Sequence, residues 1–509
     1  MVILDGNHLS IEDVVRVARE NEAVKLSETG KAQVLESNSR LEAILQSDRS
    51  VYGINTGFGI FADQRIPRKD SAILSRNLII SHAVGTGPAL PAEIVRAAMV
   101  VRANTLVKGY SGVRLEVINT ILEMLNRGVT PIVPSQGSLG SSGDLCLLSH
   151  MALVFTTDPA DNEEDSGLAE INGVVYSGKQ AMQIAGIPRI ELGPKEGLAI
   201  NNGATFCAAE AALNVYDAQY LCNVAELCLA TTIEALQGCS SAFDARLHEA
   251  RGLRGQIEVA EKIRELTSGS TLLDSCDRIQ DAYSLRCAPQ VQGMTRDTVR
   301  FVWDIIEKEI NAATDNPLIF EPDIALSGGN FHGEPVGMAM DFLGIAVAEL
   351  GAIAERRTYR LTDGKINSGL PAMLVDTPQA AGLNSGLMMP QYTSVSLVLE
   401  NQTLAYPDSV HSLPTSGSQE DHNANAMTAA RHASSIIENT YHILAVELYT
   451  AVRALDLRLR LNPDRQAGQR IEEVRKLIRA QIPYRAGDIQ WGVEIKKLKE
   501  MIINRKLCL

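Results

Sequence analysis

The sequence predicts a mainly α-helical protein whose core is a bundle of long helices. Several long segments contain helix-forming residues with apolar positions on more than one face, and short alternating segments typical of strands are few. Helices without a single polar face are buried against one another, often across subunits. The chain has 509 residues, 45% of them hydrophobic, so it is long enough to form a large core.

Four segments predict the long helices of this bundle: 205–237, 294–313, 335–361 and 424–455. Gly238 follows the first segment and provides a helix stop. The third segment contains the most apolar stretch of the chain, but Asp341, Glu349 and Glu355 interrupt it. This pattern indicates a buried helix rather than a membrane span.

Two short segments predict small β elements near the N-terminal end, MVILDG at 1–6 and GVVYSG at 173–178. We expect two domains that form one integrated unit. Residues 1–200 form an N-terminal domain with the loops around Tyr52 and Ser142, and residues 201–509 form a central and C-terminal bundle of long helices.

Charge and cysteine content limit the classes of function. The formal net charge of −14 argues against nucleic-acid and anionic-membrane partners, which need basic surface, but it leaves room for a small anionic ligand held by one arginine. The eight cysteines are scattered, and no CxxC or HExxH pattern indicates a metal site. No basic and then apolar leader is visible at the start, so we expect a cytoplasmic protein with reduced thiols.

Seven segments, six of which contain glycine, separate the predicted helices, and each carries one or two reactive side chains. They are YGINTGFG (52–59), SHAVGTG (81–87), GSLGSSGDLCLLSH (137–150), NNG (201–203), QDAYSLRCAPQ (280–290), SGGNFHGEP (327–335) and SGSQEDH (416–422). Glycine lets backbone approach closely, and loops held by a rigid scaffold often carry function. We therefore expect these segments to converge on one cavity.

Six motifs within these segments, in this order along the chain, resemble those of the aromatic amino acid ammonia-lyases, and within that family the histidases (histidine ammonia-lyases): YGINTGFG, GSLGSSGDL, NNG, QDAYSLRC, GGNFHGEP and SQEDH. The resemblance covers essentially the whole chain. It implies a long-helix bundle of the ammonia-lyase (fumarase/aspartase-like) type, assembled as a homotetramer whose active sites each take residues from three subunits.

The resemblance also implies a prosthetic group made from the protein's own backbone, 4-methylideneimidazol-5-one (MIO). By position, it forms from Ser141, Ser142 and Gly143. The amide nitrogen of Gly143 attacks the carbonyl of Ser141, and Ser142 loses its hydroxyl to leave a methylidene carbon. Ser141 departs from the usual alanine, and its hydroxyl remains on the ring, where it can form a hydrogen bond or slow cyclisation. No metal or diffusible cofactor is expected.

The family's catalytic residues match several positions of this chain. Tyr52 is the candidate base for the β-proton, and because a free phenol has a pKa near ~10, its surroundings must ionise it at neutral pH. Asn202 is expected to donate to the ring carbonyl and to make the group more electrophilic. Arg286 is expected to bind the substrate carboxylate through a bidentate fork.

Other positions match the family's pocket. Gln280 and Tyr283 are expected to orient the amine and the cofactor, while Asn316 and Phe331 are expected at the pocket wall. Each also has a plainer interpretation; in particular, Asn316 precedes Pro317 and can be a turn residue. His332 and His422 have no metal-ligand company in the sequence, which favours structural hydrogen bonds for both.

Two positions favour histidine as the substrate. His82, in a Ser-His pair, can exchange a hydrogen bond with an imidazole, and Glu420 can accept an imidazole N–H or take part in proton transfer. The predicted reaction is the MIO-dependent conversion of L-histidine into urocanate and ammonia, a step of histidine catabolism.

Departures from the histidase pattern at Ala204, Ala282 and 423–432 keep open a 2,3-aminomutase, or a lyase for another aromatic amino acid. A helical scaffold that has lost the prosthetic group and only binds ligands or partners is a further alternative.

Overall fold

The computed structural model describes residues 1–47, 50–57, 59–61 and 63–507, and these residues form two compact units. Unit 1 comprises Met1–Tyr216, Val302–Asp341 and Pro407–Arg431; unit 2 comprises Asp217–Phe301, Phe342–Tyr406 and His432–Leu509. The chain therefore changes units several times, and most of these changes fall inside long helices. The division expected from the sequence, 1–200 and 201–509, stays a prediction.

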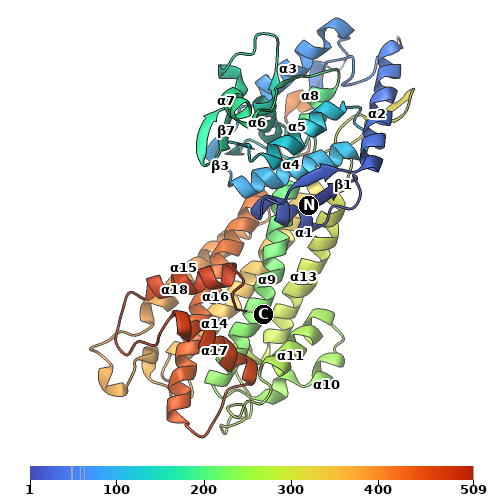
Figure 1. Cartoon of the computed structure of the whole chain (residues 1–509). Helices are drawn as coiled ribbons and strands as arrows, with labels where there is room; N and C mark the ends of the chain where they lie inside the picture. Colours follow the sequence, from blue (N-terminus) through green and yellow to red (C-terminus); the bar gives the residue numbers. More distant parts are fainter. Residues whose placement is uncertain (48–49, 58, 62, 508–509) are drawn as a thin grey trace. The chain divides into compact units, whose positions relative to one another are not determined.

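The four expected long helices are present, and the fold is mainly α-helical as predicted. They are α9 (Phe206–Ala235), α13 (Ala288–Glu309), α14 (Glu334–Thr362) and α16 (Ala426–Leu461) (Figure 1). The start of α13 lies N-terminal to the expected residue 294. Pro289 does not prevent this, because the first turn of a helix tolerates proline.

A fully buried polar cluster links three of these helices within unit 2. The Glu447 carboxylate of α16 accepts hydrogen bonds from Arg357 of α14 at 2.5 and 2.8 Å and from the Thr232 hydroxyl of α9 at 3.1 Å. A buried charge must be paired in this way to offset its loss of hydration. The cluster therefore fixes how the three helices align within unit 2.

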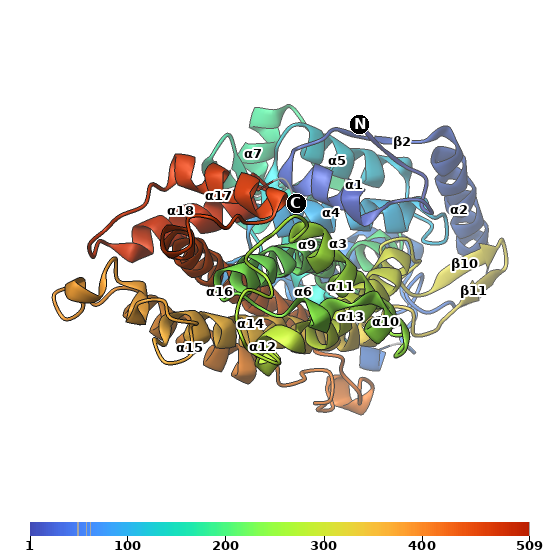
Figure 2. The same cartoon turned by 90° about the horizontal axis from the view of Figure 1, so that it is seen from below.

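Shorter helices complete unit 2 (Figure 2). They are α10 (Ala245–Glu249), α11 (Arg254–Leu266), α12 (Tyr283–Arg286), α15 (Met388–Leu404), α17 (Gln469–Gln481) and α18 (Trp491–Ile503). Asp456 of α16 accepts hydrogen bonds from Arg475 and Arg479 of α17 at 2.6 and 2.7 Å. The rings of Tyr449 on α16 and Trp491 on α18 pack edge to face, 6.1 Å apart.

The helices that lie wholly in unit 1 are α1 (Ile11–Arg19), α2 (Glu28–Gln46), α3 (Ser71–His82), α4 (Ala92–Val107), α5 (Leu115–Asn126), α6 (Leu145–Phe155), α7 (Gly178–Ala185) and α8 (Glu196–Asn201). Among them, the almost completely buried α4 packs against α1, α2 and α5. The start of α1 is specified locally, because Ser10 and Asp13 form a capping box. Continuous burial from Ile94 to Val107 makes α4 the centre of this unit.

Unit 1 also contains small sheets of two or three strands. The strands of unit 1 are β1 (Val2–Leu4), β2 (Val24–Leu26), β3 (Thr86–Ala89), β4 (Thr130–Pro131), β5 (Pro134–Gln136), β6 (Thr156–Thr157), β7 (Leu168–Ile171), β8 (Val174–Ser177), β9 (Ile190–Glu191), β10 (Leu318–Glu321) and β11 (Ile324–Leu326). The predicted segments at 1–6 and 173–178 correspond to β1, which pairs parallel with β2, and β8, which closes an antiparallel sheet in the order β4-β7-β8.

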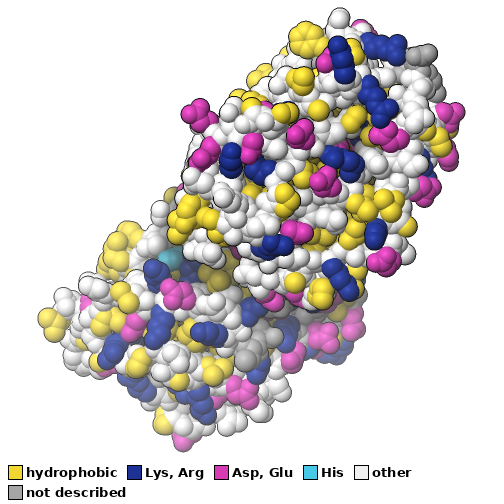
Figure 3. All heavy atoms as spheres, turned by 45° about the horizontal axis from the view of Figure 1, so that its top comes forward, with side chains coloured by type: hydrophobic (Ala, Val, Ile, Leu, Met, Phe, Trp, Pro, Cys, Tyr) yellow, Lys and Arg dark blue, Asp and Glu magenta, His cyan; other side chains and the backbone are white. Residues whose placement is uncertain are grey.

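The apolar helix α14 is buried as expected. In the part of the chain that the structure describes, it is the one helix long and apolar enough to cross a membrane, and 67% of its most apolar window is buried. This degree of burial is typical of a core helix. On the face shown in Figure 3, acidic and basic side chains are interspersed with hydrophobic ones.

Candidate active site

The serine loop (139–143) connects β5 to α6, and its conformation depends on glycine. Gly143 has a φ of +73° and pairs with Gly203 in a parallel bridge. A Cβ on Gly143 would lie 2.0 Å from the carbonyl carbon of Gly203, closer than atoms can approach. A Cβ on Gly203 would lie 2.6 Å from the Thr314 hydroxyl and 2.7 Å from Nη2 of Arg102. Only two glycines permit this backbone contact.

The contact brings two hydrogen-bond donors to one carbonyl oxygen. The Ser142 oxygen accepts from Nδ2 of Asn202 at 2.9 Å and from the backbone N–H of Gly203 at 3.2 Å. Asn202 directly follows α8 and is buried, and its Oδ1 has no hydrogen-bond partner within the described chain. The Asn202 amide therefore donates to the Ser142 carbonyl, and its role toward a prosthetic group stays a prediction.

Buried charged groups that the sequence did not predict lie close to the serine loop. Asp144 accepts a hydrogen bond from the Ser138 hydroxyl at 2.7 Å and from the backbone N–H of Cys207 at 3.0 Å, and burial raises its pKa. Arg102 donates to the Ala199 carbonyl at 3.2 Å, and burial lowers its pKa to about 10. Asp144 belongs to the GSLGSSGDL motif, which is a signal that could have identified it. Nothing in the sequence around Arg102 distinguishes it from a surface arginine.

Glu420 contacts both serines of the loop. Its Oε2 accepts from the Ser141 hydroxyl at 2.7 Å, and its Oε1 accepts from the Ser142 hydroxyl at 3.1 Å. The backbone near Glu420 is also attached to the serine loop, because the N–H groups of Ala424 and Asn425 both donate to the Leu139 carbonyl, at 3.2 and 2.8 Å. Two segments almost 280 residues apart therefore form one wall.

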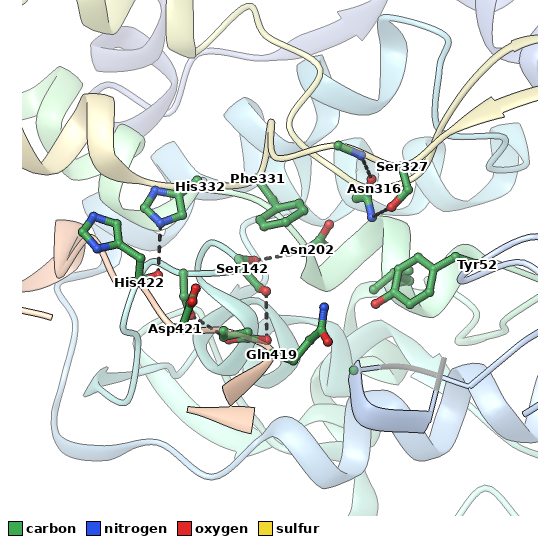
Figure 4. A pocket seen from close by; sticks show the side chains of 15 residues that line it. Tyr52, Ser142, Asn202, Asn316, Ser327, Phe331, His332, Gln419, Asp421 and His422 are labelled. Carbon is green, nitrogen blue, oxygen red and sulfur yellow. Dashed lines mark hydrogen bonds between the residues drawn. The ribbon is translucent and has the colours of Figure 1, made fainter. Parts of the chain in front are cut away.

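Two adjoining pockets of about 410 and 710 Å³ open beside this wall. Both are lined by Tyr52, Gly59, Ser142, Leu198, Asn202 and Glu420. Figure 4 shows the smaller pocket, with the side chains of Tyr52, Ser142 and Asn202 around the same space. Phe331 and Asn316 line only the smaller pocket, and His82 lines only the larger one.

Burial has opposite effects on the two ionisable groups that share this space with Glu420. It raises the pKa of Tyr52, and the negative charge of Glu420 raises it further. A tyrosine that serves as a base at neutral pH must be ionised by its surroundings, so the electrostatics of the described chain act in the opposite direction. Burial lowers the pKa of His82, whose Nδ1 lies 3.0 Å from the Ser81 hydroxyl, and this favours a neutral imidazole at neutral pH.

The polar groups of Asn316 are used within the protein. Its Nδ2 donates to the Ser327 hydroxyl at 3.0 Å, and its Oδ1 accepts from the Gly328 N–H at 2.8 Å (Figure 4). The amide thus anchors the loop after β11, which agrees with the turn interpretation while the residue still lines the pocket.

His332 Nε2 lies 3.2 Å from the His422 carbonyl, and the two rings stack 5.7 Å apart. Among the described residues, no group of three or more His, Cys, Asp or Glu side chains could hold a metal ion.

Gln280, Tyr283 and Arg286 belong to unit 2 and form part of one short segment. The Arg286 guanidinium lies 4.6 Å from the centre of the Tyr283 ring, and its Nε donates to the Asp281 carbonyl at 2.9 Å. Gln280 is exposed, and 70% of Tyr283 is exposed. Ala282 lies just before α12 as its N-cap, with a φ of −64°, a value that proline also adopts, so this departure from the family pattern leaves the local backbone compatible with both residues.

Comparisons with known proteins give a consistent result. A family model described as aromatic amino acid lyase matches residues 9–480. Histidine ammonia-lyase of Clostridium tetani is 46% identical over 510 residues, which cover 99% of this chain and 96% of that protein. The histidine ammonia-lyase of Gloeobacter violaceus is 45% identical, with 99% and 96% covered.

Solved structures agree over nearly the full length of the chain. The crystal structure of histidine ammonia-lyase from Trypanosoma cruzi superposes with a TM-score of 0.90 at 36% identity, covering 99% of this chain and 94% of that one. That of tyrosine aminomutase from Streptomyces globisporus superposes with a TM-score of 0.92 at 33% identity, covering 100% and 97%.

Proposed function

The chain belongs to the aromatic amino acid lyase family, and we propose that it converts L-histidine into urocanate and ammonia. The observation that carries this proposal is the position of Glu420 and His82 in pockets that share Ser142 and Asn202. Glu420 can accept an imidazole N–H, and a neutral His82 can donate or accept one hydrogen bond. Relatives named histidine ammonia-lyase at 44–46% identity support the same substrate.

The residues of the serine loop fit the MIO group. Gly143 has no side chain to hinder its amide nitrogen, and the Ser142 carbonyl already accepts from Asn202 and Gly203. These two donors would hold the ring carbonyl and withdraw charge from the ring. When present, the group supplies a carbon electrophile, which ordinary side chains lack.

The remaining chemistry belongs to side chains of this protein. Tyr52 lines both pockets and is the candidate to remove the β-proton of the substrate. Its raised pKa means that the phenolate is scarce at neutral pH and increases as the pH rises. Asn202 orients the ring carbonyl, while His82 and Glu420 bind the imidazole.

We place Arg286, Tyr283 and Gln280 in the active site of a neighbouring subunit of a homotetramer. Arg286 would bind the substrate carboxylate through its two terminal nitrogens. The exposure of Gln280 and Tyr283 supports this proposal, because side chains of a substrate pocket are not expected to face solvent in the working enzyme. Exposed hydrophobic residues elsewhere in unit 2 are typical of a surface that other subunits cover: Met294, Phe301, Phe342, Ile345, Met389, Tyr392 and Leu399.

The proposed enzyme works in the cytoplasm without nucleic-acid or membrane partners. Each of the seven cysteines in the described part of the chain has a free thiol, as expected for a reducing compartment. The net charge of −14 is unfavourable for binding polyanions.

The test is product analysis with purified protein and L-histidine. We expect urocanate, followed by its ultraviolet absorbance, and an equal amount of ammonia. The mass of the intact chain should be lower by two water molecules, because ring formation expels both. A chain of unmodified mass, or a chain that gives no urocanate, would contradict the proposal.

A second candidate outcome is a 2,3-aminomutase, which returns the amine to the β-carbon. The superposition on tyrosine aminomutase, with a TM-score of 0.92, favours keeping it. Chromatography of the same reaction separates the candidates: β-histidine as the main product indicates a mutase. Parallel reactions with tyrosine and phenylalanine test the substrate.

A further inference from the structure

Ser141 and Glu420 form a contact that the family's usual alanine at position 141 would lack. Ser141 is 7% exposed, and its hydroxyl donates to Oε2 of Glu420 at 2.7 Å. This is the shorter of the two serine–carboxylate contacts, since Ser142 donates to Oε1 at 3.1 Å. Hydrogen bonds to an ionised acceptor are stronger than those between neutral groups.

The backbone around Glu420 is held independently of its side chain. The Thr415 N–H donates to the Glu420 carbonyl at 2.7 Å, and Asn425 donates to Leu139 at 2.8 Å. These bonds fix where the side chain starts but not where its carboxylate lies. Glutamate has several rotatable bonds, so ordering it costs conformational entropy unless a specific partner holds the carboxylate.

This inference rests on the proposed function, under which only one of the two serine contacts survives formation of the prosthetic group. Ser142 gives up its hydroxyl when the prosthetic group forms, so its contact with Glu420 disappears. Ser141 keeps its hydroxyl and remains attached to the same ring. Of the two hydroxyls, only that of Ser141 is still present in the mature protein.

We propose that Ser141 is a positioning residue, which holds the Glu420 carboxylate beside the reacting centre after Ser142 has lost its hydroxyl. The contact occupies Oε2 of Glu420 and leaves Oε1, which pointed to Ser142, available to the substrate. Glu420 thereby keeps its charge close to Tyr52 and His82, the two titratable groups whose pKa it affects. In this chain the Ser141 hydroxyl provides a constraint on Glu420 that the alanine of other members cannot provide.

The experiment compares Ser141→Ala, Glu420→Gln and their combination, with Ser166→Ala as a matched control. Ser166 is also buried, and its hydroxyl donates to the Glu163 carbonyl at 2.6 Å, but it does not line either pocket. Three quantities are measured for each variant: the intact mass, the separate values of kcat and KM for L-histidine, and the pH profile of kcat/KM.

We expect Ser141→Ala to lose two waters as the parent chain does and to show about tenfold lower kcat/KM, the size of effect expected for a lost hydrogen bond to a charged group. The limb of its pH profile on which kcat/KM rises with pH should move to lower pH, because a displaced carboxylate no longer raises the pKa of Tyr52. Ser141→Thr, which keeps the hydroxyl, should restore most of the activity and the position of the limb. Ser166→Ala should leave all three measurements unchanged.

The combined variant distinguishes positioning from an unrelated defect. If Ser141 acts through Glu420, the loss of kcat/KM in the combined variant should be smaller than the product of the two separate losses. Substitutions at two residues in contact do not have independent effects on the free energy. Fully multiplicative losses, or a Ser141→Ala pH profile identical to that of the parent, would overturn the proposal. A Ser141→Ala chain that keeps its full mass would overturn it too, by assigning Ser141 to ring formation instead.

If the alanine variant does not accumulate as folded protein, Ser141→Cys replaces it, because a thiol is similar in size but a weak donor. If the parent chain itself keeps its full mass or makes no urocanate, the proposed function fails. That failure is distinct from one in which only the Ser141 variants behave like the parent.

Discussion

Gly143 and Gly203 lie against one another as a parallel bridge, and neither position has room for a side chain. The hydrogen bond from Asp144 N–H to the Gly203 carbonyl, at 2.9 Å, lies next to the bond from Gly203 N–H to the Ser142 carbonyl, at 3.2 Å. The backbone around Gly203 thus holds Ser142, the residue that we propose is converted, and also provides one of the donors to its carbonyl.

Gly203→Ala tests this contact. The new Cβ would lie 2.6 Å from the Thr314 hydroxyl and 2.7 Å from Nη2 of Arg102, at a φ of +123°. We expect about 3 kcal/mol lower stability toward urea, as for an overpacked core, and no loss of two waters in the mass spectrum. Gly128→Ala is the control, because its φ is +72° but nothing lies within 4 Å, so the cost should be about 1 kcal/mol. Equal effects of the two substitutions would contradict the steric argument.

Asn202→Ala removes the donor at 2.9 Å from the Ser142 carbonyl and leaves the longer bond from Gly203. We expect kcat to fall about 100-fold, the effect of losing one preorganised donor, while KM changes little. The intact mass must be measured as well, so that kcat refers to chains that carry the ring.

The control for this experiment is Asn126→Ala. The amide of Asn126 donates to the Val24 carbonyl at 2.9 Å in a part of unit 1 that does not line the pockets. It should lower stability without changing kcat for each ring-carrying chain. A drop in kcat of similar size in both variants would remove the special role of Asn202.

The raised pKa of Tyr52 predicts how activity depends on pH. If the phenolate is the base, kcat/KM should rise with pH into the alkaline range, since burial and the charge of Glu420 both disfavour ionisation. Glu420→Gln removes one of these two causes. The rising limb should then move to lower pH, whatever the change in absolute rate. A limb that stays in place or moves to higher pH would argue against Tyr52 as the titrating group, as would a Tyr52→Phe variant that keeps the limb.

Mixed tetramers test whether active sites are shared between subunits. Tyr52→Phe and Arg286→Ala should each be nearly inactive alone, because one lacks the candidate base and the other lacks the carboxylate partner. Tyr52 lies in unit 1 and Arg286 in unit 2. When the two variants are expressed together, random assembly of sites from different subunits places both native residues in about a quarter of them. Activity near that fraction of the parent supports sharing, whereas mixtures as inactive as the separate variants contradict it.

The secondary structure of the core could be predicted because its signals are local. The helices α9, α14 and α16 follow from continuous stretches of helix-forming, apolar residues, and the boundaries deviate by only a few residues from the expected ones, apart from the C-terminal end of α16 and the N-terminal end of α13. Pro289 explains the second of these, since proline in a first turn is compatible with a helix but reads as a break in a sequence.

The sequence by itself determined which residues this protein has for chemistry: a Ser-Ser-Gly loop, a tyrosine, an asparagine before a glycine, and a glutamate in a loop. These follow from short motifs whose residue types can be read in order. Only the tertiary structure decided their partners, because contacts between segments such as 139–143 and 415–425 depend on how distant helices pack. It places Glu420 on both serines, uses the Asn316 amide to hold a loop, and buries Arg102 beneath Gly203. Side-chain partners and burial set pKa values and hydrogen bonds, so the raised pKa of Tyr52 could not be read from the chain alone.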